Sequence, residues 1–369
     1  MIKKRVFGFL LTALVALLAL WSLSSGATER VYYIAAEEVD WEYMPVQENR
    51  MMGRLLNDEE KIFTASTNDL IGSQYKKAVF YAYTNENFNQ RVKRVQNEKH
   101  LGVLGPLIRA EVGDTIKLVF KNKASRPYTV HPHGVFYEKH SEGVPYADGT
   151  TGKDKADDNV APGKTYTYIW EVPERAGPGP NDGSSIAWLY HSHVDEVKDT
   201  NTGLVGAIIV TRKGMANTDG SPKDIDRELV TLFTVMDENQ SWYLDENIRH
   251  YTGAEQSDEH EAQEEFEESN LMHSINGYLY GNIPGLDMKV GEKVRWYQLA
   301  LGTEVDLHTP HWHGNTGLYD GRRVDVVELL PATMKVVDMM PDNPGIWMFH
   351  CHVNDHLSAG MSALYTVLE

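Results

Sequence analysis

The sequence predicts an all-β protein made of two antiparallel β-sandwiches or barrels. Short runs rich in β-branched and aromatic residues recur along the chain, and clusters of Gly, Pro, Asn and Asp separate them. Helical periodicity is scarce, which disfavours helical bundles and α/β folds. The clearest runs are residues 78–84, 115–120, 166–172, 204–211, 228–236 and 362–368.

An internal repeat divides the chain into two halves. Residues 188–194 match residues 347–353, and each segment contains a His-x-His triplet at the same place. Upstream in each half, a Val-Gly-Asp or Val-Gly-Glu turn, a strand-like run and a second triplet follow in the same order. The repeat predicts domains at residues 28–213 and 226–369, joined by a polar linker.

Residues 1–27 have the pattern of a secretory signal peptide: basic residues, then an apolar run, then small residues. The apolar run is close to the shortest length that spans a bilayer, so an uncleaved N-terminal anchor is the alternative. The segment predicts a secreted or periplasmic protein.

Charge and cysteine content narrow the possible partners. The formal net charge of -18 argues against nucleic acid or an anionic membrane, and it fits a cationic substrate or solubility alone. Cys351 is the only cysteine, which excludes a disulfide within the chain. The cores must therefore be stabilised by burial and by bound metal.

Ten of the fifteen histidines fall into four short clusters, and the cysteine lies inside the last. Successive side chains of a strand point to opposite faces, so both histidines of a triplet share one face. One triplet is ordinary, but four in one chain indicate ligands that converge on several metal ions. The clustered histidines are His131, His133, His191, His193, His308, His311, His313, His350, His352 and His356.

The second half contains the ligand set of a blue-copper site. Cys351 supplies a thiol, His356 an imidazole five residues later and Met361 a thioether ten residues later, while His308 comes from another strand. Strand alternation points the two neighbours of Cys351 to the opposite face, toward the other histidines. One short segment thus joins a one-electron site to a second metal site.

The first half repeats this scaffold without the thiol. Ser192 stands in the place of Cys351, Val197 in the place of the second imidazole and Tyr128 in the place of His308. This half cannot hold a blue copper, but its four histidines have the number and type to complete a cluster with four from the second half. Eight imidazoles suit three coppers.

At these residues the chain resembles the multicopper oxidases, and beyond them the ceruloplasmin and hephaestin group. The resemblance implies a Greek-key cupredoxin barrel in each half and four coppers per functional unit. Two-domain members of the family form homotrimers with each trinuclear cluster between two subunits, and the same is implied here. The matching stretches are residues 71–77, 101–108, 190–199, 237–247 and 345–352.

The resemblance also implies a role for each ligand. Electrons enter at the type 1 copper and pass through Cys351 to the trinuclear cluster, where dioxygen is reduced to water. The implied ligands are His308, Cys351, His356 and Met361 for type 1; His131 and His311 for type 2; and His133, His191, His193, His313, His350 and His352 for type 3.

Residues 255–268 are crowded with Asp and Glu, and by themselves they are typical of a solvated loop. The stretch that contains Glu268 and His273 resembles the iron ligands of ceruloplasmin, however, and Asp355 matches a third ligand. Oxygen donors with one imidazole suit Fe(II), and still better the Fe(III) produced. We therefore predict a ferroxidase, which couples one-electron oxidation of Fe(II) to the reduction of O2.

Two further roles follow from the resemblance. Part of an insertion in the first half, residues 141–164, resembles a calcium loop, although aspartates in such a loop also serve as turn formers. Asp148 resembles the carboxylate that relays protons during oxygen reduction. The predicted calcium donors are the backbone of Lys139 and the side chains of Asp154, Asp157 and Asp158.

Other functions use related machinery. A laccase-like phenol oxidase needs an apolar pocket at the type 1 site, whereas a cuprous oxidase would use the acidic segment and methionines such as Met334 and Met348. A copper nitrite reductase keeps its type 1 copper in the first domain, against which Ser192 argues. A copper-binding module without turnover would have lost ligands that are all present here.

Overall fold

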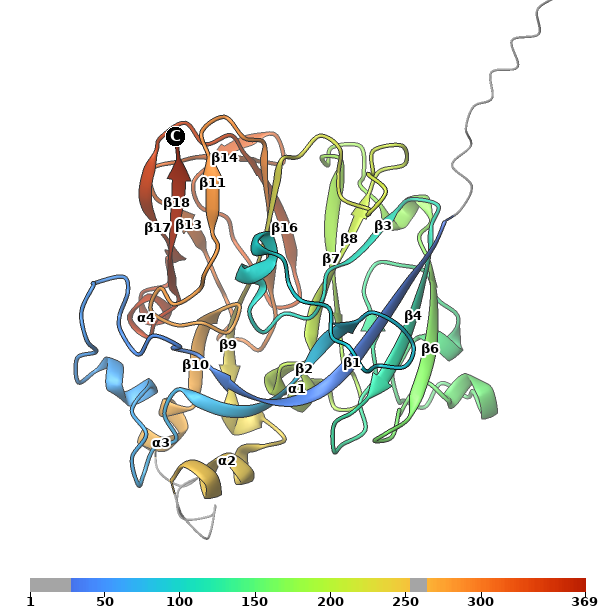
Figure 1. The fold of residues 1–369 in the computed structure, drawn as a ribbon, viewed down its shortest axis with the longest axis horizontal. Coiled ribbons are helices and arrows are strands. Elements are labelled where there is room, and N and C mark those ends of the chain that lie inside the picture. Colours follow the sequence, from blue (N-terminus) through green and yellow to red (C-terminus); the bar gives the residue numbers. More distant parts are fainter. Residues whose placement is uncertain (1–27, 253–263) are drawn as a thin grey trace, which may run out of the picture.

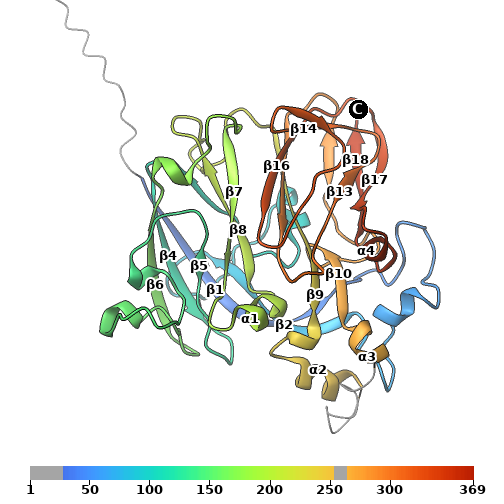
Figure 2. The ribbon, with the colours of Figure 1, turned by 180° about the vertical axis from the view of Figure 1, so that it is seen from behind.

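The computed structural model describes residues 28–252 and 264–369. Within them the chain forms four β-sheets and a few short helices (Figure 1). Two sheets are built from β1 to β8 and two from β9 to β18, and these two pairs lie side by side in both views (Figures 1 and 2). The predicted all-β class is confirmed.

The first pair consists of sheets with the strand orders β2-β1-β4-β6 and β3-β8-β7-β5. In β4, burial alternates: Ile116, Leu118 and Phe120 face the core, whereas Lys117 and Val119 between them are only partly buried. The strands are β1 (Glu29–Glu42), β2 (Gln74–Tyr83), β3 (Ile108–Glu111), β4 (Thr115–Asn122), β5 (His131–Pro132), β6 (Thr165–Glu171), β7 (Ser185–His191) and β8 (Val205–Thr211).

The second pair has the orders β10-β9-β12-β16-β14-β15 and β11-β18-β17-β13. Its core is aromatic: the rings of Trp312 and Phe349 stack at 5.2 Å, and Trp296 packs on both. The strands are β9 (Arg227–Asp237), β10 (Leu271–Ile275), β11 (Asp287–Lys289), β12 (Val294–Ala300), β13 (Pro310–Trp312), β14 (Gly317–Tyr319), β15 (Arg322–Val324), β16 (Met334–Met339), β17 (Gly345–Cys351) and β18 (Ser362–Leu368).

The helices are short and lie at the ends of strands. The first, α1, begins where the side chain of Asp195 accepts a hydrogen bond from the backbone of Lys198, which satisfies a free amide of the first turn. The α-helices are α1 (Glu196–Thr202), α2 (Leu244–Tyr251), α3 (Glu264–Ser269) and α4 (Asn354–Ser358), and the 3-10 helices are η1 (Glu60–Phe63), η2 (Gln96–Leu101), η3 (Lys139–Ser141), η4 (Gly152–Lys155), η5 (Glu174–Ala176) and η6 (Glu238–Gln240).

A third buried cluster joins the two pairs of sheets. It combines Val79 and Leu189 of the first pair with Val230, Leu232 and Leu299 of the second, all of them almost fully buried. Burial of apolar surface is the main favourable contribution to folding, so this seam stabilises one arrangement of the two pairs.

The six predicted runs correspond to β2, β4, β6, β8, β9 and β18. The polar stretch 213–226 lies between β8 and β9, and the division into two domains stays a prediction. The predicted signal peptide, and residues 255–263 of the acidic segment, lie outside the described residues. Among the helices that the structure describes, none has the length and apolar character required to cross a membrane.

Candidate copper centres

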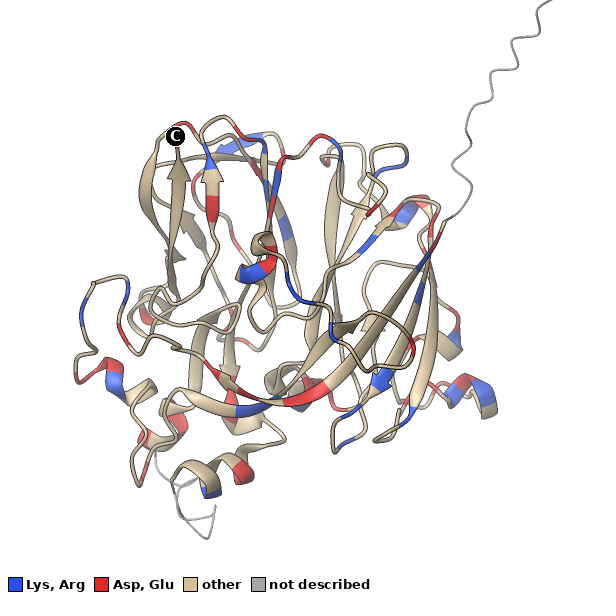
Figure 3. Ribbon diagram, viewed as in Figure 1, with Lys and Arg blue, Asp and Glu red and all other residues tan. Residues whose placement is uncertain are grey.

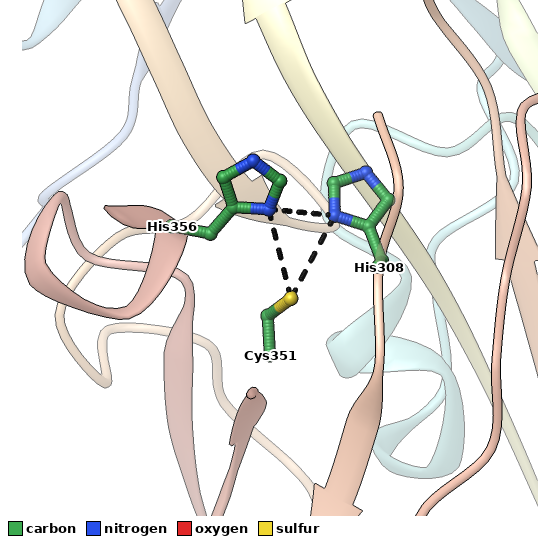
Figure 4. Close-up of side chains that lie close together, drawn as sticks. All are labelled: His308, Cys351 and His356. Atoms are coloured by element: carbon green, nitrogen blue, oxygen red, sulfur yellow. Dashed lines mark hydrogen bonds between the residues drawn. The ribbon is translucent and has the colours of Figure 1, made fainter. Parts of the chain in front are cut away.

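Three side chains of the predicted type 1 set meet at one end of the second pair of sheets (Figure 4). Cys351 ends β17, His356 lies in α4, and His308 lies just before β13. The Nδ1 atoms of His308 and His356 are 3.1 Å apart and lie 3.8 and 3.6 Å from the thiol sulfur. All three residues are buried, so they form a compact donor set shielded from water.

Met361 is held next to this set by the backbone. Its carbonyl accepts a hydrogen bond from the amide of Cys351 at 3.1 Å, and its amide donates to the carbonyl of His356 at 2.9 Å. The side chain is fully buried. One thiol, two imidazoles and one thioether are the donors that a blue-copper site requires, so the residues present fit copper.

The environment of Cys351 favours the ionised thiol. Burial by itself raises the pKa of Cys351, but the contacts with His308 and His356 and the amide of Thr309 lower this pKa to about 6. The thiolate is the form of cysteine that binds metal. The site is therefore prepared for a metal before one is bound.

Asp306 belongs to this centre, although the sequence did not single it out. It is buried, and its Oδ1 lies 3.1 Å from Nε2 of His308. It also accepts hydrogen bonds from the amides of Val235 at 2.7 Å and Thr303 at 2.8 Å. A carboxylate at the far nitrogen fixes the orientation of a ligand imidazole, so Asp306 turns Nδ1 of His308 toward Cys351.

The second-half histidines form a separate group on β13 and β17. His311 pairs with His350 across the two strands, and Nε2 of His350 lies 3.1 Å from Nε2 of His313 and 3.3 Å from Nδ1 of His311. The ring of His352 lies 5.4 Å from that of His350. The Nδ1 atom of His350 donates to the carbonyl of Cys351 at 2.7 Å, which leaves its Nε2 free for a metal.

The first-half histidines repeat this pattern on β5 and β7. His131 pairs with His191, and Nε2 of His133 lies 3.1 Å from Nε2 of His191. The Nδ1 atom of His191 lies 3.0 Å from the carbonyl of Ser192, the counterpart of the contact made by His350. The ring of His193 lies 5.3 Å from that of His191. The structure thus brings together the four predicted ligands of each half.

In the first half, Ser192 replaces the thiol and takes part in hydrogen bonds. The amide of Thr129 donates to the hydroxyl of Ser192 at 3.0 Å, as the amide of Thr309 does to Cys351. Ser192 in turn donates to buried Asp199 at 2.6 Å. Tyr128 contacts the hydroxyl of another tyrosine at 3.3 Å. A hydroxyl, a phenol and a carboxylate do not form a blue-copper donor set.

Within one chain the two groups of four histidines are not brought together. In the described part of the chain, every ring contact among these eight histidines joins two residues of the same half. His352 is exposed, and His131 and His311 are only partly buried. A cavity of about 500 Å³ also opens at His131 and His133.

The predicted iron ligands surround the surface side of the type 1 set. His273 lies on β10, and its ring centroid is 5.3 Å from that of His356. Its Nδ1 donates to the carbonyl of Leu271 at 2.9 Å, so Nε2 is the free nitrogen. Glu268 lies in α3, where burial and then the nearby charge of Asp355 raise its pKa. Asp and Glu positions in and around α3 are red on the ribbon (Figure 3).

The predicted calcium and proton-relay residues lie around η3 and η4. Asp157 is buried, accepts the amide of Gly143 at 2.7 Å and has one oxygen without a hydrogen-bond partner among the described residues. Asp158 pairs with Lys155 at 3.0 Å. Oδ1 of Asp154 lies 3.9 Å from Nδ1 of His140. An unpaired buried oxygen fits a cation, and the calcium site stays a prediction.

Asp148 accepts two hydrogen bonds from Thr150 and pairs with Lys155 at 2.9 Å and Lys139 at 3.1 Å. The bonds from Thr150, followed by those from the lysines, hold the pKa of Asp148 well below its usual range. At neutral pH the carboxylate is therefore ionised, a state that accepts a proton and has none to donate. The relay role stays a prediction.

Both halves match family models described as multicopper oxidase, at residues 83–214 and 251–369. The chain belongs to the multicopper oxidase family. Copper is the cofactor of this family, in agreement with the donor sets described above. Multicopper oxidases use O2 and a reduced donor.

Curated multicopper oxidases with similar sequences are considerably longer than this chain. It is 46% identical over 346 residues to ferroxidase HEPHL1 of Homo sapiens, 46% identical over 346 residues to hephaestin of Mus musculus, and 45% identical over 345 residues to ceruloplasmin of Rattus norvegicus. The matches cover 93%, 92% and 92% of this chain but only 29%, 29% and 31% of the relatives. The chain thus spans about three tenths of their length.

Solved structures with similar folds include a multicopper oxidase with a TM-score of 0.57, at 19% identity over 93% of this chain and 90% of that chain. A copper nitrite reductase from Nitrosomonas europaea has a TM-score of 0.58, at 16% identity over 93% of this chain and 95% of that chain. These likenesses confirm the predicted cupredoxin-like fold.

Proposed function

We propose that this chain is a ferroxidase, which oxidises four Fe(II) ions to Fe(III) while one O2 and four protons become two water molecules. The observation that supports it is the position of His273, whose ring lies 5.3 Å from that of the type 1 ligand His356. An iron ion bound by His273 would therefore lie next to a ligand of the type 1 copper, which accepts the electron. The similarity to proteins named ferroxidase supports the same activity.

The residues around His273 suit Fe(II) as the substrate. Glu268 and Asp355 supply hard oxygen donors, which bind Fe(III) more tightly than Fe(II) and so favour loss of an electron. Burial and then the negative charge of Asp355 raise the pKa of Glu268, and a cation bound by both carboxylates would relieve this repulsion. A cavity of about 340 Å³, lined by Glu264, Glu267 and Glu268, opens beside them to solvent.

The protein holds its cofactor with residues that are already oriented. Bound copper supplies one-electron redox chemistry at the thiolate and oxygen reduction at the imidazole groups. Asp306 orients His308, and the carbonyl of Cys351 orients His350. Because His350 and Cys351 are neighbours in β17, this strand connects the two predicted copper sites. Burial of Cys351 and His308 keeps water from the one-electron centre.

We expect Glu268→Gln and Asp355→Asn each to lower kcat/KM for Fe(II) by about 10- to 100-fold, a loss of about 1.4 to 2.8 kcal/mol in transition-state stabilisation. Each amide keeps the size of the side chain but removes the charge that binds the ion. Oxygen consumption with Fe(II) gives the rate, and the absorption spectrum reports whether the type 1 copper is intact.

Glu264→Gln is the matched control, because Glu264 lines the same cavity without being a predicted ligand. An equal loss in this control would mean that the acidic surface only attracts cations. Unchanged iron kinetics in both ligand variants would reject the site. Faster turnover of Cu(I) or of a methoxyphenol than of Fe(II) would favour the cuprous or the laccase-like alternative.

We also propose a homotrimer in which the first half of one subunit and the second half of its neighbour complete each trinuclear cluster. Support comes from the two groups of histidines that stay apart within a chain and from the exposure of His352. The cavity at His131 and His133 has room for ligands from another subunit. In a closed ring, the first half of each subunit meets the second half of one neighbour, so every cluster is completed.

Complementation between inactive subunits tests this arrangement. One variant carries His131→Ala and His133→Ala, the other His311→Ala and His313→Ala, and each is inactive alone. Random mixing in a ring leaves about a quarter of the interfaces with both sets intact, so oxidase activity should return to about a quarter of the wild-type value. Trimers that contain both variants can be purified by giving each variant a different affinity tag. If these trimers recover no activity, the cluster lies within one chain.

An extracytoplasmic location, either secreted or periplasmic, completes the proposal. The signal-like residues 1–27 support it. Mass spectrometry of the protein purified from whole cells and from the medium would identify the mature N-terminus. A chain that keeps its first residues in the cytoplasm would contradict the proposal.

A further inference from the structure

One cavity lies away from every predicted copper, iron and calcium ligand. It has a volume of about 760 Å³, within the range of small-molecule sites. Strands β1 and β2 form one wall, residues 91–107 cross over it, and Tyr278 contributes from the second half of the chain. Figure 1 shows the crossing segment in front of these strands.

Arg94 is a partly buried cation that lines this cavity. Its Nη1 donates to the carbonyl of Gly102 at 2.6 Å, and its Nη2 donates to the carbonyl of Leu104. Across residues 28–252 and 264–369, no carboxylate oxygen forms an ion pair with it. Burial lowers the pKa of Arg94 but leaves the side chain charged at neutral pH.

Arg91, which also lines the cavity, has a carboxylate partner. Its guanidinium is paired with Glu37 and stacks over the ring of Tyr81 at 3.8 Å. Lys93 and Glu98 also line the cavity, and the charge of Glu98 acts on Arg94. With Arg91 paired to Glu37, the cations Lys93 and Arg94 exceed the one carboxylate of Glu98 by one positive charge, which an anion at hydrogen-bond distance would balance.

Aromatic side chains surround Arg94. Tyr81 and Tyr278 lie close enough to interact with its charge, and their hydroxyls have no hydrogen-bond partner among the described residues. Trp41 also lines the cavity, with its ring 5.3 Å from that of Tyr278 and its indole nitrogen donating to Gly277 at 2.8 Å. The wall is therefore a flat apolar surface next to a cation and two free hydroxyls.

We infer that this cavity binds a small aromatic acid. The carboxylate would accept hydrogen bonds from Arg94 and the hydroxyl of Tyr278, while the ring would pack against Trp41 and Tyr81. A metal cation is disfavoured by the positive charge of Arg94. A flexible aliphatic acid would lose more conformational freedom than a rigid ring on the same wall.

Titration of the copper-loaded protein with 1-naphthoate tests the inference by calorimetry and by quenching of tryptophan fluorescence. We expect one molecule per chain, with quenching abolished in Trp41→Phe. Arg94→Met should raise Kd at least about tenfold, and binding of the neutral analogue 1-naphthalenemethanol should change less than about twofold. Lys93→Met, at the rim, is the matched control and should change Kd for naphthoate less than about twofold.

Arg94→Lys and Tyr278→Phe guard against misfolding of the first variant, because each keeps most of the side chain. Both should weaken naphthoate binding with an unchanged circular dichroism spectrum. Binding that is equally strong in all the Arg94 and Tyr278 variants would overturn the inference, as would the absence of saturable binding. Tighter binding of decanoate than of naphthoate would overturn the aromatic assignment.

Discussion

Cys351→Ser abolishes the blue colour and lowers oxidase turnover by about a thousandfold or more, which corresponds to about 4 kcal/mol or more in activation free energy. The expected loss is this large because Cys351 has two functions. Its sulfur is the one thiol of the predicted type 1 set, and its backbone joins His350, in β17, to His352, just after that strand. Serine keeps the shape but supplies no thiolate.

Absorption spectroscopy and steady-state oxygen uptake on copper-loaded protein measure this effect. Ser192→Ala is the matched control, since Ser192 occupies the same position in the first half and its hydroxyl makes hydrogen bonds only. We expect it to keep the colour. A Cys351→Ser protein that stays blue, or that consumes oxygen at the wild-type rate, would contradict the assignment of the type 1 site.

The grouping of the predicted copper ligands was predictable because it follows local patterns. Strand alternation and short spacings gave the grouping of His350, Cys351 and His352, and the repeat showed that Ser192 replaces the thiol. The geometry of the second group follows from register: His311 faces His350 across β13 and β17. Such features depend on the few residues around each motif.

Other features depend on contacts that no local pattern encodes. Asp306 contacts its histidine two residues away, but its importance comes from the amides of Val235 and Thr303 that hold it in place. The cavity around Arg94 requires the crossing of a loop over two strands and a side chain from the other half. The ion pair between Lys77 and Glu238 joins residues 161 positions apart.

That ion pair connects the two halves of the molecule. Lys77 lies on β2 and Glu238 on η6, and both side chains are fully buried. Lys77 also donates to the carbonyl of Asn201 at 2.7 Å, and the hydroxyl of Tyr43 donates to Glu238 at 2.6 Å. Burial lowers the pKa of Lys77 and raises that of Glu238, so each charge depends on the other.

Lys77→Met is therefore expected to lower the free energy of unfolding by about 3–5 kcal/mol, because it leaves the carboxylate of Glu238 buried without a counter-ion. The double variant Lys77→Met with Glu238→Gln should recover most of this loss, since it removes the unpaired charge as well. Urea denaturation of the metal-free proteins at one pH measures both values. Lys76→Met is the control: its ion pairs are partly exposed, so the cost should stay below about 1 kcal/mol.

The deficit of Lys77→Met should also depend on pH. Burial holds the pKa of Glu238 above its unfolded value, so the folded state binds a proton more readily than the unfolded state. Protonation then stabilises the folded variant relative to neutral pH, and the deficit should shrink as pH falls toward the unfolded pKa of glutamate, about 4.3. A deficit that is independent of pH, or a double variant no more stable than the single one, would mean that lost packing causes the effect and that the buried charge does not.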